Sequence, residues 1–117
     1  MITIGDYNVS LGQRSNCTLL IHVRKVENMG PNSAHIPAVA NHIAKYLNAP
    51  DIMFMQGIQD DSGPTNDGVV SANLTLTTLV NAIEKESNIS YSFIDIDPVD
   101  NKDARGQLGG NIRQAYL

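Results

Sequence analysis

The chain has 117 residues, a net charge of −4 and an apolar fraction of 42%, which fits one small globular domain and does not argue for a wholly disordered chain. The sequence has no apolar run near the ~18 residues that a membrane span needs, and no basic patch of the kind that nucleic-acid binders carry. An internal disulfide is impossible because Cys17 is the sole cysteine.

The N-terminal quarter predicts one strand followed by a stretch without a clear pattern. Ile2–Val9 reads as a short strand. In Ser10–Lys25, the apolar triplet Leu19–Ile21 is the sole recognisable feature. The segment begins without the charged and apolar regions of a signal peptide, so compartment is left open.

A helix and a buried strand are expected next. Over about Ala34–Leu47, apolar residues recur at helical spacing. Ser33 can cap this helix, and Pro37 is tolerated because it lies in the first turn. The apolar run within Asp51–Gln56 is typical of a buried strand.

The second half predicts a loop, a helix and two more strands. Gly57–Gly68 is rich in turn residues and reads as a loop. Asn73–Lys85 has the apolar spacing of a helix, and Tyr91–Ile96 and Ile112–Leu117 read as strands. This order predicts an α/β fold with helices packed on a mixed sheet. Because the chain stops within its last strand, which would leave an unpaired edge, we expect a truncated domain.

Four stretches together resemble the endonuclease/exonuclease/phosphatase family, the deoxyribonuclease-I-like group, and are nearest to its extracellular-nuclease-like branch. They are GDYNV (Gly5–Val9), PDIMFMQGIQDD (Pro50–Asp61), DGVVSANLTLTTLVNAI (Asp67–Ile83) and GGNIRQAYL (Gly109–Leu117). The resemblance implies that residues 1–117 are the N-terminal portion of a four-layer αββα sandwich. Members of that branch are often secreted.

The same resemblance implies a phosphoester hydrolase that uses Mg²⁺ or Mn²⁺ and acts on nucleic acid or another phosphoester. Mg²⁺ prefers hard oxygen ligands and can polarise a phosphoryl oxygen. In the family, the first strand supplies an asparagine that helps to order metal and phosphate, which here is Asn8. The second motif supplies a glutamate that ligates the metal, and a later half supplies a histidine acid/base with further ligands.

This sequence departs from the family pattern at the metal ligand. The family reads Gln-Glu-Ile-Gln-Asp where this chain has Gln56–Asp60, so Gly57 stands at the position of the glutamate. Glycine has no side chain and cannot ligate. Asp60 and Asp61 are nearby, but loop solvation and turn formation account for them better than metal binding does. His35 and His42, on or beside the first helix, are expected to be solvated or half-buried rather than ligands.

Three further positions are candidates for the site, each with a structural alternative. Asn8 is assigned the family's site role, with loop-backbone bonding as the alternative. Arg113 could be a bidentate phosphate donor in an inner strand, or a charge that faces solvent from an edge strand, which is the interpretation favoured for a truncated chain. Asn111 is a comparable, weaker phosphate-binding candidate.

A segment at about residues 10–25 interrupts the family pattern. Deleting Val9–Lys25 would join Asn8 directly to Val26, as family members do. Val9-Ser10 can be encoded by a consensus 5′ splice site, and a lysine codon can end in the AG of a 3′ splice site. The segment is therefore interpreted as a retained intron that is translated in frame, with a true loop insertion as the alternative.

The chain is thus expected to be a fragment of a metal-dependent phosphodiesterase, or nuclease, without activity of its own. Two alternatives stay open. One is a non-catalytic phosphate- or protein-binding module on the same scaffold, and the other is a gene-model fragment without independent function.

Overall fold

The computed structural model describes residues 7–10, 18–102 and 107–117, with side chains described from residue 20 onward. The elements, in chain order, are β1 (Tyr7–Ser10), β2 (Thr18–Met29), α1 (Ile36–Asn41), the π-helix η1 (His42–Tyr46), β3 (Ile52–Ile58), α2 (Asn73–Ser87), β4 (Ile94–Asp95) and β5 (Arg113–Tyr116).

The strands form one mixed five-stranded sheet in the order β1-β2-β3-β5-β4. Strands β2 and β3 are parallel and are connected through α1 and η1, whereas the other neighbouring pairs are antiparallel. A parallel pair needs such a crossover connection. The predicted α/β class, with helices packed on a mixed sheet, is confirmed.

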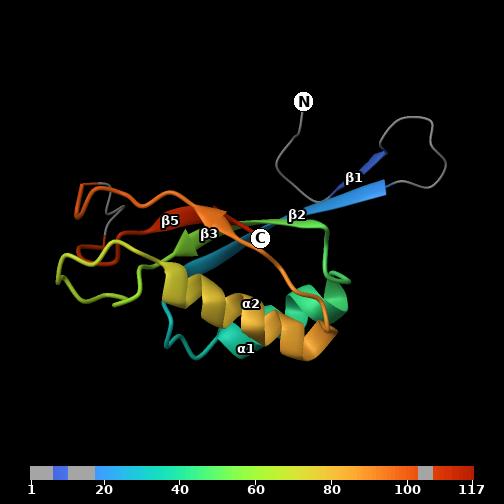
Figure 1. Ribbon diagram of the computed structural model, residues 1–117, viewed down its shortest axis with the longest axis horizontal. Helices are drawn as coiled ribbons and strands as arrows, with labels where there is room; N and C mark the ends of the chain where they lie inside the picture. The colour runs from blue at the N-terminus through green and yellow to red at the C-terminus, as the bar shows by residue number, and fades with distance from the viewer. Residues whose placement is uncertain (1–6, 11–17, 103–106) are drawn as a thin grey trace.

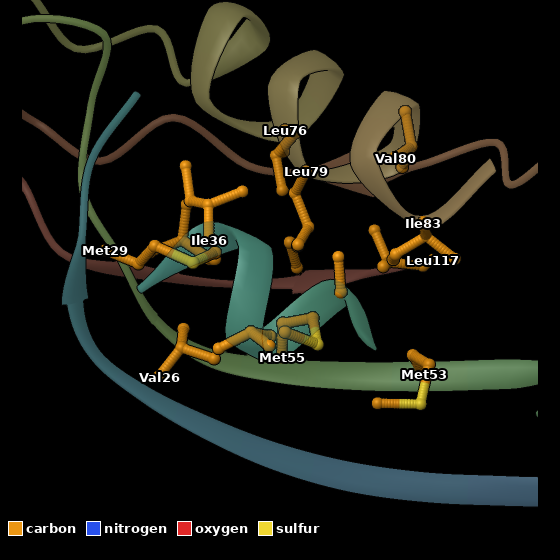
Figure 2. Packing of buried hydrophobic residues seen from close by; sticks show 14 of the residues in the cluster. Val26, Met29, Ile36, Met53, Met55, Leu76, Leu79, Val80, Ile83 and Leu117 are labelled. Carbon is orange, nitrogen blue, oxygen red and sulfur yellow. The ribbon is translucent and has the colours of Figure 1, made fainter. Parts of the chain in front are cut away.

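The helices cover one face of this sheet, and the core lies between the two layers (Figure 1). Met53 and Met55 of β3 face the α2 side chains Leu76 and Leu79 across this core (Figure 2). Alternation along β3 sends the residues between them to the opposite face. Burying one side chain of this size contributes roughly 1.5–3 kcal/mol, so this layer supplies most of the apolar stabilisation.

The expected helix over residues 34–47 is present as α1 followed directly by η1. Pro37 lies in its first turn, as predicted. The predicted cap is wrong, because the hydroxyl of Ser33 accepts a hydrogen bond from the backbone N–H of Gly30 instead. His35 occupies the cap position and makes no capping hydrogen bond with its side chain.

Strand β2 was not predicted. It includes residues 18–25, which the sequence left without a pattern. It pairs with β3 from Ile21 opposite Ile52 to Lys25 opposite Gln56, and again at Met29 opposite Ile58. Strand β4 is shorter than the Tyr91–Ile96 strand that was expected, and it contains Ile94 and Asp95 alone.

The face of the sheet away from the helices carries a second group of apolar side chains. Phe54 and Tyr116 pack there with ring centroids 4.8 Å apart. Ile94 is opposite Tyr116 and is 67% exposed, and Tyr116 is 51% exposed. No helix or strand among the described residues covers these two side chains. Within the same described ranges, no helix is long and apolar enough to cross a membrane.

Candidate functional site

Three of the sequence candidates, Gly57, Asn111 and Arg113, gather where the parallel strands β2 and β3 end. The loops that follow these strands lie side by side and line a cleft of about 200 Å³ between Gly30–Ser33 and Gln59–Pro64. The carboxyl ends of parallel strands are a common place for ligand sites. If the expected phosphodiesterase site were present, its residues would therefore lie at this edge of the sheet.

Gly57 lies at an irregularity in both strand pairings. The register of β3 with β5 shifts between Gln56 and Ile58, and the register with β2 shifts beside Glu27. Gly57 has φ +91°, and a Cβ added there would lie 3.0 Å from the backbone nitrogen of Glu27. Both the left-handed conformation and the close backbone favour glycine. The backbone conformation at residue 57 therefore leaves no room for a side chain.

Asp60, two residues beyond β3, is fully buried and organises the adjoining loops. Its Oδ1 accepts hydrogen bonds from the backbone N–H and the hydroxyl of Ser62, each at 3.0 Å. Its Oδ2 accepts a hydrogen bond from the amide of Asn111 at 2.9 Å. The bond to the Ser62 N–H forms the turn that was expected. The expected solvation is wrong for Asp60, since its exposed fraction is 0%.

Asn111 is buried at the entrance to β5 with φ 42°. Its amide nitrogen is within hydrogen-bond distance of three acceptors: the Val69 carbonyl at 2.7 Å, Asp60 at 2.9 Å and Asp100 at 3.1 Å. Its side-chain oxygen, Oδ1, accepts a hydrogen bond from the backbone N–H of Asn101 at 2.9 Å. Because an amide group has two hydrogens, these contacts use its full donor capacity. Phosphate binding by Asn111 stays a prediction.

Arg113 is 6% exposed and lies in β5, between β3 and β4. The favoured expectation of a solvent-facing charge on an edge strand is therefore wrong. Its Nη1 donates to Asp95 at 3.1 Å and to Asp97 at 2.8 Å. Its Nε and Nη2 both donate to the backbone carbonyl oxygen of Asn111. A buried guanidinium requires such partners, and a catalytic role for Arg113 remains a prediction.

Asn8 is not brought to this cluster. It lies in β1 opposite Leu20, whereas Gln56, the neighbour of Gly57, is opposite Lys25. The side chain of Asn8 is outside the described part of the structure, as is Cys17. The backbone register alone therefore separates the asparagine motif from the position of the missing glutamate.

The residues at this edge do not fit a Mg²⁺ site. Gly57 offers no ligand, and both carboxylate oxygens of buried Asp60 already accept hydrogen bonds from within the chain. Among the described residues, no group of three or more His, Cys, Asp or Glu side chains is placed to hold a metal ion. Mg²⁺ needs several oxygen ligands or waters at once.

The sequence reasoning missed the partners that hold these candidates. Asp95, Asp97 and Asp100 were assigned to a strand and a connection without a role, although they contact Arg113 and Asn111. Asp61 was assigned to the loop surface, yet its Oδ1 accepts a hydrogen bond from the N–H of Thr75 in the first turn of α2 at 2.9 Å. An acidic residue that serves a distant helix start gives no local sequence signal.

Comparison of the chain with known protein families, with curated proteins and with solved structures finds no match in any of the three.

Proposed function

We propose that this chain is the N-terminal part of a domain related to the metal-dependent phosphodiesterases and that it has no hydrolytic activity of its own. The conformation of Gly57 carries this proposal. The family's glutamate position is occupied here by a glycine in a left-handed bulge, with backbone atoms where a side chain would begin. This position therefore offers neither a carboxylate ligand nor a backbone conformation that would orient one toward a metal ion.

The open face of the sheet supports the sandwich part of the proposal. In a sandwich, the inner faces of two sheets bring their apolar side chains together. Phe54, Tyr116 and Ile94 lie on the face that no described helix covers. A second sheet on this face would complete an αββα arrangement with the helix layer already present.

A plasmid-nicking assay with Mg²⁺ or Mn²⁺ tests the proposal directly. We expect no nicking by the chain or by Gly57→Glu, because a single restored carboxylate does not supply the acid/base and further ligands of the family's later half. Asn8→Ala is the matched control. Nicking that a chelator abolishes and that Asn8→Ala loses would overturn the proposal.

A non-catalytic binding module on the same scaffold is the second candidate function. A specific observation favours it, namely a cleft on the helix side of β2 that Arg24, His35 and His42 line. The ligand of this cleft can be inferred from its chemistry.

A further inference from the structure

A cleft of about 550 Å³ lies between the second half of β2 and the helices α1 and η1. Arg24, Lys25 and Glu27 line it from β2, and His35, His42 and Tyr46 line it from the helical side. None of these side chains takes part in the contacts among Asp60, Asn111 and Arg113. The cleft is therefore a separate feature from the strand-end cluster.

Two polar atoms of this cleft are buried without a partner. Within the described part of the chain, the Nε of Arg24 and the Nδ1 of His42 make no hydrogen bond. Buried polar groups are almost always paired, and leaving one unpaired is costly. Since the two atoms come from opposite walls of one cleft, a single ligand between the walls can satisfy both.

The charge of the cleft indicates the sign of that ligand. The whole protein is acidic, with a net charge of −4. Arg24 is opposite the core-facing Met55, so the side chain of the next residue, Lys25, lies on the other face of the sheet. In the cleft, the Nε–H of Arg24 lacks an acceptor, and two imidazoles lie on the facing wall. The Nε–H and Nη–H groups of arginine form a fork that matches phosphate oxygens. An anion with several oxygens fits this arrangement better than a cation or an apolar group.

The π-helical turn adds an independent observation. Residues His42–Tyr46 form η1, which contains neither proline nor glycine. Such turns are rare and occur frequently at functional sites. In this turn His42 stacks on Tyr46 with ring centroids 5.6 Å apart, and Tyr46 is 74% exposed. An aromatic surface therefore lies at the edge of the basic cleft.

We propose that this cleft binds a phosphate group, with Arg24 and His42 as its buried contacts. The group could be free phosphate or the phosphate of a nucleotide whose base stacks on Tyr46. The proposal does not depend on phosphodiesterase descent. It concerns the chain with residues 18–25 in β2, as the structure has them.

Calorimetric titration of the full chain with inorganic phosphate, at constant ionic strength, tests this proposal. We expect saturable binding that Arg24→Gln weakens about tenfold, the size of one charge-assisted hydrogen bond. His42→Phe should weaken it several-fold, and this variant keeps the test decisive if Arg24→Gln does not fold, because it removes Nδ1 and keeps a ring that can stack on Tyr46. Lys85→Gln removes the same charge from the exposed side of α2 and should leave binding unchanged.

A parallel titration with adenosine monophosphate distinguishes the two sources of phosphate. Tighter binding that Tyr46→Ala reduces to the level of inorganic phosphate identifies a nucleotide site, and equal binding identifies a free-phosphate site. Absence of saturable binding by the unmodified chain overturns the proposal, as does a loss in Lys85→Gln equal to that in Arg24→Gln or His42→Phe. The nicking assay measures hydrolysis and the titration measures phosphate binding. Failure of the phosphodiesterase proposal therefore does not affect the phosphate-site proposal, and the reverse also holds.

Discussion

Gly57 combines a positive φ with close backbone neighbours, and these two constraints can be measured separately. Gly68 has a similar φ of +82°, but a Cβ added there meets nothing within 4 Å. A non-glycine residue in such a conformation costs about 1–2 kcal/mol. We therefore expect Gly68→Ala to lower the free energy of unfolding by about that amount, and Gly57→Ala to lower it further. Urea denaturation of both variants measures the difference, and equal losses would contradict the role of the Glu27 backbone.

Arg113 binds two carboxylates that differ in exposure. The side chain of Asp95 is 10% exposed and that of Asp97 is 53% exposed. Removing one partner of a buried pair costs roughly 3–5 kcal/mol, whereas exposed pairs contribute about 0–1 kcal/mol. We expect Arg113→Met to destabilise the fold strongly and Asp97→Asn to have little effect. A loss in Asp97→Asn as large as in Arg113→Met, measured by thermal unfolding, would contradict this assignment.

The sequence located several of these residues but not their partners. Gly57, Asn111 and Arg113 were singled out because of a motif, and all three lie at or beside the ends of β3 and β5. The hydrogen bond between Asn111 and Asp60 joins residues 51 positions apart. Such a contact follows from strand order and loop path, which a motif does not encode.

At the level of elements, Tyr91 connects the segment after α2 to the start of β3. Its hydroxyl donates a hydrogen bond to the Pro50 carbonyl. Burial, and then the nearby charge of Asp51, raise the pKa of Tyr91 to about 12 from the usual 10.0. Both effects disfavour the tyrosinate in the folded chain.

This pKa shift predicts a loss of stability at alkaline pH. Below about pH 10 the tyrosine is protonated in both states, and its contribution to stability is fully present. Between about pH 10 and pH 12 the unfolded chain releases the proton first, so stability falls as pH rises. We expect Tyr91→Phe to flatten the stability profile in this window. Thermal unfolding across the window measures the effect, and parallel profiles for the two proteins would contradict it.

Elements with strong local periodicity were predicted, and those defined by long-range pairing were not. Helix α2 and strand β3 occupy the residues that their apolar spacing predicted, to within two residues at each end. Strand β2 was missed because polar residues such as His22, Arg24 and Lys25 follow its apolar start. Its pairing with β3 defines it as a strand, and non-local pairing is weakly visible in a single sequence.

At the scale of the whole molecule, two segments are candidates for the position beside β3, namely residues 18–25 and the N-terminal residues 1–8. Deleting Val9–Lys25 would put Asn8 directly before Val26, in the position that Lys25 holds opposite Gln56. Residues 1–8 would then replace residues 18–25, with Ile4 in the place of Ile21. The asparagine motif would lie next to Gly57, as the resemblance to the phosphodiesterase family implies.

We therefore expect the shortened chain to fold cooperatively, with its N-terminal segment paired to β3. Cysteines introduced by Asn8→Cys and Gln56→Cys should form a disulfide in the shortened chain, since neighbouring strands bring paired residues within disulfide range. The same pair in the full-length chain, with Cys17→Ser to prevent competition, should not. Mass spectrometry under oxidising conditions measures the link. An unfolded shortened chain, or a shortened chain that forms no disulfide, would instead make residues 18–25 an obligatory part of this sheet.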